Sequence, residues 1–133
     1  MSNTLETLDF PKSHRLLNSS DFTPVFDAPS FKIQHSNFLI LTKYNNLGHP
    51  RLGIIVAKKN IRRAVQRNQT KRAIRESFRH KQHNLLAIDA IVLARRGSEQ
   101  LAKEQVREIL DSLWNRAAKK SKTQKNDSQN SAG

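Results

Sequence analysis

The sequence predicts an α+β protein, a single-domain α/β sandwich in which helices pack on a central, mostly antiparallel sheet of about four strands. Three observations support this fold class. The chain has 133 residues, a length that suits one domain with one hydrophobic core. Short apolar runs rich in β-branched residues alternate with segments in which apolar residues recur at helical spacing. The resulting order is helix, strands, helix, strand, helix.

The first predicted element is a short helix in the segment NSSDFTPVFDAP, residues 18–29. Its apolar residues Phe22, Val25 and Phe26 fall on one side of the helix, and a proline ends it. One of three polar residues at its start can cap it: Ser19, Ser20 or Asp21.

Four short segments predict the strands. The runs at residues 37–44 and 51–59 are separated by the turn formers of NNLGHP, so we expect them to be neighbouring antiparallel strands. A further strand is expected near residues 31–34. Another is expected in AIDAIVLARRG, residues 87–97, which ends at a glycine.

Beyond Ser98 the chain predicts a long helix whose apolar residues repeat at steps of three and four. This stripe is expected to lie on the sheet, and core packing is favoured over a binding role for Trp114. The apolar residues of the stripe are Leu101, Val106, Ile109, Leu110, Leu113, Trp114 and Ala117.

The two ends of the chain are polar and cannot bury enough apolar surface to offset the entropy of ordering. We therefore expect residues 1–9 to be a flexible N-terminus, residues 10–118 to form the domain, and residues 119–133 to be a basic disordered tail. The chain has no cysteine and no run typical of a signal peptide or a membrane span. A cytoplasmic protein without a membrane partner, monomeric by itself, is the expectation.

Charge is concentrated in the middle of the chain. The formal net charge is +13, and residues 51–80 hold ten basic side chains against one acidic side chain. Such a surplus works against compaction by self-repulsion and is typical of proteins whose partner is a polyanion. Nucleic acid is the leading candidate.

The segment AVQRNQTKRAIRESFR, residues 64–79, predicts a helix with two different faces. A modestly apolar face would lie on the sheet and consists of Thr70, Ala73, Ile74, Ser77 and Phe78. The opposite face is a basic strip that consists of Asn68, Lys71, Arg72, Arg75 and Arg79. One acidic residue, Glu76, lies four residues past Arg72, so most of the strip is unpaired along the helix.

Repulsion between like charges at these spacings destabilises a helix, and phosphates of a partner would remove that cost. Arginine predominates on and beside the strip, where its planar fork suits contacts with phosphate and stacking on bases. The pattern therefore favours nucleic-acid binding over an idle solvated surface. Lys58 and Lys59, at the end of the preceding strand, extend the same surface.

These residues resemble the bacterial ribonuclease P protein component, the family of small basic subunits that assist a catalytic RNA in removing the 5′ leader of precursor tRNA. The resemblance rests on RLLNSSDFTPVF, RLGIIVAKKN and AVQRNQTKRAIRESFR and covers about residues 10–117. The family pattern is Arg-Asn-Arg, then Lys-Arg, then Arg-Glu, and the residues at these positions are Arg67, Asn68, Lys71, Arg72, Arg75 and Glu76. The third position of the first run is Gln69, a departure that weakens or reroutes one contact to Arg62 or Arg63.

The resemblance implies a fold with a left-handed βαβ crossover that contains the basic helix. It also implies two RNA partners, the ribonuclease P catalytic RNA and the single-stranded leader of precursor tRNA. The RNA-subunit contacts would be Arg62, Arg63, Arg67, Asn68, Lys71, Arg72, Arg75 and Arg79. The leader would lie in a cleft between the sheet and the first helix, with contacts from Phe22, Phe26, Phe38, Lys58 and Lys59, and with Ile40 as a further neighbour.

Two interpretations of Phe22 and Phe26 remain open, contact with RNA and burial in the core. Aromatic side chains beside positive charge hold single-stranded RNA by stacking. Paired phenylalanines on a short amphipathic helix, however, are more often buried in a core.

The sequence holds no evident catalytic set of its own. Its five histidines are scattered, its eleven acidic residues are dispersed, and we expect no metal or cofactor bound by the protein. The resemblance implies that hydrolysis belongs to the RNA subunit and uses Mg²⁺, so that the protein is part of an endoribonuclease without catalysing the step.

Three other classes of protein remain to be weighed. A ribosomal protein or RNA chaperone would share the charge but not the spacing of the basic residues. A helix-turn-helix DNA reader would need helices where strands are predicted. A membrane-surface helix would need a larger apolar face than Ile74 and Phe78 supply.

Overall fold

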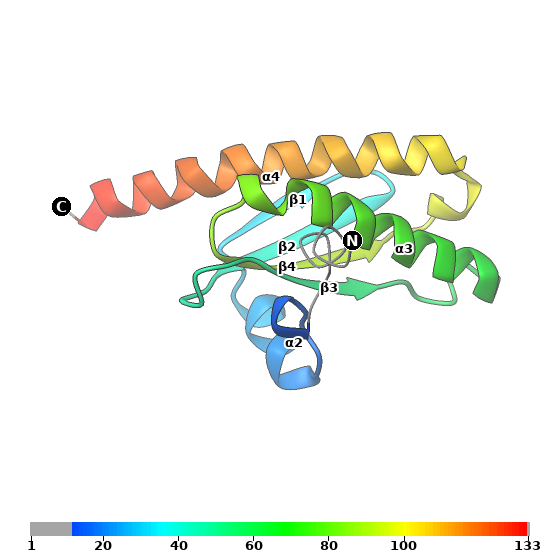
Figure 1. The fold of residues 1–133 in the computed structure, drawn as a ribbon, viewed down its shortest axis with the longest axis horizontal. Coiled ribbons are helices and arrows are strands. Elements are labelled where there is room, and N and C mark those ends of the chain that lie inside the picture. Colours follow the sequence, from blue (N-terminus) through cyan, green and yellow to red (C-terminus); the bar gives the residue numbers. More distant parts are fainter. Residues whose placement is uncertain (1–11, 133) are drawn as a thin grey trace, which may run out of the picture.

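The structure is a computed structural model that describes residues 12–132 of the chain. It confirms the predicted α+β class, with one four-stranded sheet and helices on both of its faces (Figure 1). The elements in order are η1 (Lys12–His14), α2 (Ser19–Asp27), β1 (Phe31–Gln34), β2 (Phe38–Tyr44), β3 (Arg51–Ile55), α3 (Ala64–Lys81), η2 (Gln82–Asn84), β4 (Ile88–Ala94), η3 (Ser98–Gln100) and α4 (Lys103–Ala132).

The helices divide unequally between the two faces of the sheet. α3 and α4 lie side by side on one face, and the short α2 lies on the other (Figure 1). The face under α3 and α4 is therefore the main core, whereas the face under α2 is covered only in part.

The strand order is β1-β2-β4-β3, which corrects one prediction. The chain segments 37–44 and 51–59 were expected to pair with each other, but β4 lies between β2 and β3. β4 pairs antiparallel with β2 and parallel with β3. β1 pairs antiparallel with β2, so the sheet is mostly antiparallel as predicted.

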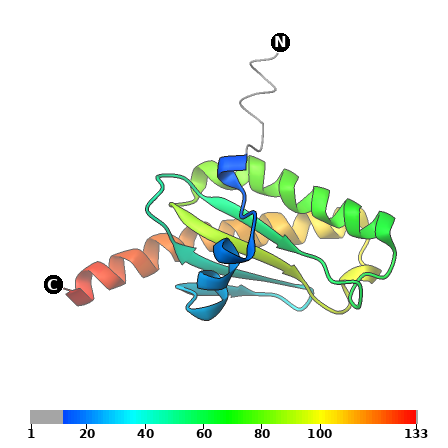
Figure 2. The same ribbon diagram turned by 90° about the horizontal axis from the view of Figure 1, so that it is seen from below.

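The connection from β3 through α3 to β4 joins two parallel neighbours. Followed through Figures 1 and 2, this crossover is left-handed, whereas such connections are almost always right-handed. Because the crossover is left-handed, α3 lies on the same face of the sheet as α4, and the opposite face is covered by α2. The left-handed βαβ unit implied by the family resemblance is therefore present.

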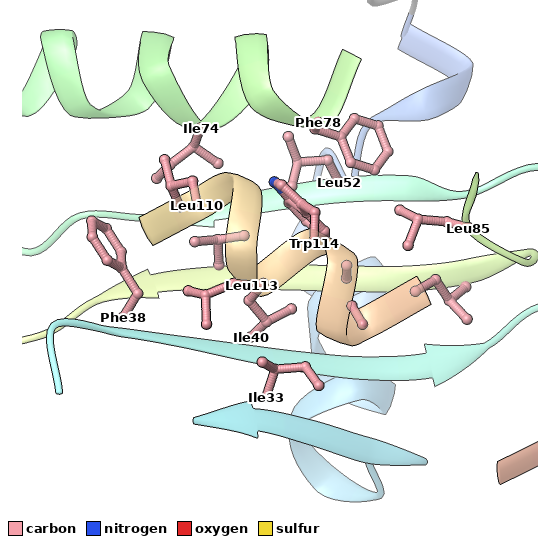
Figure 3. Close-up of a cluster of buried hydrophobic side chains, with 14 of the residues drawn as sticks. Ile33, Phe38, Ile40, Leu52, Ile74, Phe78, Leu85, Leu110, Leu113 and Trp114 are labelled. Atoms are coloured by element: carbon pink, nitrogen blue, oxygen red, sulfur yellow. The ribbon is translucent and has the colours of Figure 1, made fainter. Parts of the chain in front are cut away.

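The main core is formed by the inner sides of α3 and α4 and by alternate residues of the strands (Figure 3). Trp114 is fully buried at its centre, and its ring meets that of Phe78 edge-on with centroids 5.4 Å apart. The indole Nε1 donates a hydrogen bond of 2.9 Å to Ser77 Oγ. The predicted structural role of Trp114 is thus confirmed, because its one polar atom is satisfied inside the core.

A second, smaller cluster holds α2 on the opposite face of the sheet. It contains Leu16, Val25, Leu41 and Ile91, all buried. The cap of α2 is Asn18 rather than one of the three residues predicted, because its side chain accepts from the backbone of Asp21 in a capping box. The cap lies one residue earlier than the sequence alone suggested.

The C-terminal part of α4 differs from the expected tail. The helix continues to Ala132, beyond the predicted domain end at residue 118. Ser121 is fully buried, and its carbonyl oxygen accepts a hydrogen bond from the Tyr44 hydroxyl. This contact fixes the helix to β2 at a point that the sequence assigned to disorder. The predicted flexible N-terminus, residues 1–9, lies outside the described residues.

A membrane span is missing from the part of the chain that the structure describes, since none of its helices is both long and apolar enough to cross a bilayer.

Candidate nucleic-acid interface

α3 has the two faces that its sequence predicts. Thr70, Ile74, Ser77 and Phe78 are buried against the sheet and α4, and Ala73 is half-buried. On the outer side, Asn68 and Arg72 are exposed, and the remaining members of the basic strip are partly exposed, namely Lys71, Arg75 and Arg79. Packing of the inner face thus fixes the orientation of the strip.

One member of the strip is paired within the chain. Arg79 forms an ion pair with Glu76, which also lies 3.8 Å from Nε2 of His80. Glu76 lies four residues past Arg72, but the ion pair that it forms is with Arg79, three residues further along the helix. Among the described residues, no carboxylate forms an ion pair with Lys71, Arg72 or Arg75. The middle of the strip is therefore electrostatically uncompensated.

Arg67 has a different environment from the strip. Its Nη1 donates hydrogen bonds to the carbonyl oxygens of Ile61 at 3.1 Å and Arg62 at 2.8 Å. These carbonyls belong to the segment that leads into α3. Part of the Arg67 guanidinium is consequently engaged within the chain, and its remaining nitrogen atoms are those that a phosphate could reach.

Arg62 is paired with a residue that sequence reasoning did not single out. Glu99 in η3 accepts a hydrogen bond of 2.8 Å from the backbone N–H of Arg62 and lies 3.3 Å from its guanidinium. The backbone hydrogen bond and then the side-chain contact with Arg62 lower the pKa of Glu99, to which the charge of nearby Arg63 also contributes. Glu99 is therefore ionised at neutral pH.

A second basic cluster lies at the carboxyl ends of β3 and β4. Lys58 and Lys59 are exposed after β3, as the sequence suggested, while Arg95 and Arg96 follow β4. Asn60 joins the two strand ends, because its side-chain amide donates a hydrogen bond of 2.8 Å to the Ala94 carbonyl.

Sequence reasoning missed Arg95 and Arg96. The run ARRG follows a predicted strand, but only the parallel pairing of β3 with β4 brings it to the same edge of the sheet as Lys58 and Lys59. At that edge the Arg95 side chain donates a hydrogen bond of 3.1 Å to the His35 carbonyl oxygen. Carboxyl ends of neighbouring parallel strands meet at one edge of a sheet, a position where open α/β sheets often bind ligands.

The face of the sheet under α2 is partly open. Phe26 is 42% exposed, and Phe22 is half-buried beside the cluster that holds the helix. A methyl group at Gly53 would lie 2.8 Å from the Phe22 ring, so the glycine permits the ring to lie directly on β3. Of the two open interpretations, Phe26 fits the exposed one and Phe22 is intermediate.

The prediction for Phe38 is wrong. Its side chain is fully buried in the main core on the α3 and α4 face, and so is that of Ile40. Successive residues of a strand point to opposite faces, so the β2 residues on the α2 side are Leu39 and Leu41. Phe38 cannot contact a ligand beside α2.

Polar contacts fix α2 at both ends. Arg51 in β3 forms a bidentate pair with Asp89, with distances of 2.8 and 2.7 Å, and lies 3.7 Å from Asp21 at the start of the helix. Hydrogen bonding to Asp89 raises the pKa of Arg51. At the other end, Lys43 donates a hydrogen bond to the carbonyl oxygen of Ala28. The helix is thus held in a set position above the sheet.

The histidines are less scattered than the sequence suggests. The rings of His14 and His49 stack with centroids 4.2 Å apart. Burial lowers the pKa of His14, and the charge of His49 lowers it further. Within residues 12–132, no group of three or more histidine or acidic side chains is placed to hold a metal ion.

Comparisons with known proteins agree on one family. A family model described as Ribonuclease P matches residues 10–118. The chain is 57% identical over 111 residues to the ribonuclease P protein component of Saccharophagus degradans, which covers 84% of this chain and 82% of that protein. It is 51% identical over 116 residues to the ribonuclease P protein component of Marinobacter nauticus, with 87% of each covered.

Similarity to solved structures extends to the fold. The RNase P protein of Staphylococcus aureus superposes with a TM-score of 0.73 at 34% identity, covering 80% of this chain and 96% of that chain.

Proposed function

This chain belongs to the ribonuclease P protein family and is thus a subunit of ribonuclease P, and we propose that it binds the RNA subunit through α3 and the precursor tRNA leader on the α2 side of the sheet. In this proposal the RNA subunit catalyses the hydrolysis with Mg²⁺. The protein contributes binding energy at two surfaces.

The observation that carries the proposal is the uncompensated basic strip on α3. Lys71, Arg72 and Arg75 lack carboxylate partners among the described residues, and their helix is fixed by a packed inner face. Phosphate groups would relieve the repulsion between them, with release of the counterions condensed on the RNA. Arginine adds planar donors that match phosphate oxygens. The RNA-binding residues proposed here are Arg62, Arg63, Arg67, Asn68, Lys71, Arg72, Arg75 and Arg79.

The proposal for the leader rests on the α2 side of the sheet. Phe26 is exposed and Phe22 is half-buried. The second basic cluster, which consists of Lys58, Lys59, Arg95 and Arg96, lies at one end of the same sheet. Single-stranded RNA is held by such a combination of aromatic rings and positive charge, with about 1 to 3 kcal/mol for each stacked base. Phe38 is excluded from this surface by its burial.

A leader contact would give the protein a specific task in the reaction. Precursor tRNA carries the leader, whereas the mature product does not. Binding energy from the leader therefore favours precursor over product and prevents the holoenzyme from being occupied by mature tRNA.

Reconstitution with a bacterial ribonuclease P RNA tests the proposal. At low Mg²⁺ concentration, we expect leader cleavage to depend on this protein and to fall when Arg72 and Arg75 are changed together to glutamate. A competition assay should show that the protein raises the preference for precursor over mature tRNA. If the protein binds many RNAs equally and leaves cleavage unchanged, a general RNA chaperone is the better description.

A further inference from the structure

The segment that leads into α3 carries two of the proposed RNA contacts, Arg62 and Arg63. The helix begins with Arg63 at the N-cap position, and that side chain makes no capping hydrogen bond. A helix start normally relies on such a cap to satisfy its first backbone N–H groups. The segment is held instead by other contacts, first by Ile61, which is fully buried in the main core just before Arg62.

Contacts on both sides hold the backbone of Arg62. Oε2 of Glu99 accepts a hydrogen bond of 2.8 Å from the Arg62 N–H. On the other side, Arg67 donates to the Arg62 carbonyl oxygen. Gln66, in the first turn of α3, donates a hydrogen bond of 2.6 Å to the Glu99 carbonyl oxygen, so η3 and α3 are fastened to each other as well.

The carboxylate of Glu99 also orients the side chain of Arg62. Nε of Arg62 lies 3.3 Å from Oε2, and Nη2 lies 3.3 Å from Oε1. The Glu99 side chain is 23% exposed, whereas that of Arg62 is 81% exposed. A partly buried acid therefore holds an exposed guanidinium at the N-terminal end of α3, where most of the donors still face solvent.

We infer that Glu99 is a positioning residue for RNA-subunit binding, which sets the backbone before α3 and the direction of the Arg62 guanidinium. This inference rests on the proposed function of α3. Its physical basis is preorganisation: a side chain held in its bound direction loses less conformational freedom when a phosphate arrives. Arg67 completes the arrangement from the other side of the same peptide.

The inference predicts an effect opposite to that of simple electrostatics. A carboxylate beside Arg62 and Arg63 repels phosphate, so its removal by itself should strengthen binding to RNA. If Glu99 instead positions the arginine, its removal should weaken binding. The sign of the change in affinity therefore separates the two accounts.

The experiment measures the affinity of the full chain for a bacterial ribonuclease P RNA at several salt concentrations. We expect Glu99→Ala to weaken binding about ten-fold and to lower the salt slope by about one, because one phosphate contact is lost. Glu99→Gln keeps an oxygen that can accept from the Arg62 N–H, so a smaller loss of about three-fold is expected. In an Arg62→Ala background, the effect of Glu99→Ala should shrink to less than half.

The matched control is Glu108→Ala, which removes the same charge from the exposed side of α4. Its RNA affinity should stay the same or rise slightly. Circular dichroism identifies variants that are folded under the assay conditions, and Glu99→Gln carries the test if Glu99→Ala does not fold.

Two results would overturn the inference. The first is unchanged or tighter binding by folded Glu99→Ala or Glu99→Gln. The second is weaker binding with an unchanged salt slope, since the loss would then come from general destabilisation. The proposed function is tested separately by Arg72→Glu with Arg75→Glu: if that pair matters and Glu99 does not, only the present inference fails.

Discussion

Helices α3 and α4 pack side by side on the same face of the sheet, yet their outer surfaces carry different charges (Figure 1). Ala64–Lys81 of α3 has six basic residues and one acidic residue, whereas Lys103–Arg116 of α4 has three of each. Both helices bury apolar residues in the same core. Packing therefore does not require the charge of α3, because the segment Lys103–Arg116 of α4 packs on the same core with equal numbers of basic and acidic residues.

The largest expected effect concerns the core that the two helices share. Trp114→Ala should lower the free energy of unfolding by about 3 to 5 kcal/mol, through loss of buried aromatic area and of the partner of Ser77. Denaturant unfolding measures this change. RNA affinity at a temperature where the variant is folded should stay within about two-fold of the parent; a large loss there would mean that the contacts of Trp114 with Phe78 and Ser77 are needed to orient the basic strip of α3.

The next effect separates the two outer surfaces. Arg72→Glu with Arg75→Glu should weaken binding to the RNA subunit by about 100-fold, or about 2.7 kcal/mol, and reduce the salt slope by about two. Arg107→Glu with Lys119→Glu makes the same charge change on exposed positions of α4. Filter binding across a salt series compares them. Equal losses for both pairs would show that net charge, and not the strip, determines affinity.

A smaller effect is expected on the opposite face of the sheet, under α2. Phe26→Ala should reduce the preference for precursor over mature tRNA by about ten-fold, since one stacked base contributes about 1 to 3 kcal/mol. Val25→Ala is the matched control, because Val25 is adjacent and fully buried. It should reduce stability and leave the preference intact. The proposed leader surface is contradicted if both variants change stability only.

The smallest expected effect concerns the histidine pair of His14 and His49. Burial, and then the charge of His49, keep the folded-state pKa of His14 below its ordinary value of 6.5, so the unfolded chain binds more protons than the folded chain just below that pH. The stability contributed by His14 is thus fully present above pH 6.5 and is lost as the pH falls through the folded-state value. Urea unfolding at a series of pH values should show this slope, and His14→Asn should flatten it.

Much of the helical structure could be predicted from the sequence. In α3, spacings of three and four residues assign Ile74 and Phe78 to the core and Arg72 to solvent, as the structure confirms. In α4, the same spacing predicts that Trp114 is buried, and the structure confirms it. Helical periodicity depends on neighbours along the chain, so the sequence contains the information directly.

The sequence did not predict how the strands pair or that α4 continues beyond residue 118. β2 and β3 are joined by a short turn-forming segment typical of a hairpin, yet β4 separates them. β2 is apolar at successive positions, so alternation could not tell which of Phe38 and Leu39 faces α2. Residues 119–123 are polar in sequence, and in the structure this part of the helix is held by tertiary contacts, from Tyr44 to the Ser121 carbonyl oxygen and from Lys120 to the Lys32 carbonyl oxygen.

The amino-acid sequence by itself determined the fold class, the amphipathic character of α3 and the concentration of positive charge in the middle of the chain, because these depend on composition and local spacing. Tertiary structure alone decided which residues meet. It placed Glu99 on Arg62, the Arg95 guanidinium on the His35 carbonyl oxygen, and Phe38 away from α2. These arrangements involve residues far apart in the chain. The contact of Glu99 with Arg62 forms because the left-handed crossover brings the ends of β3 and β4 together.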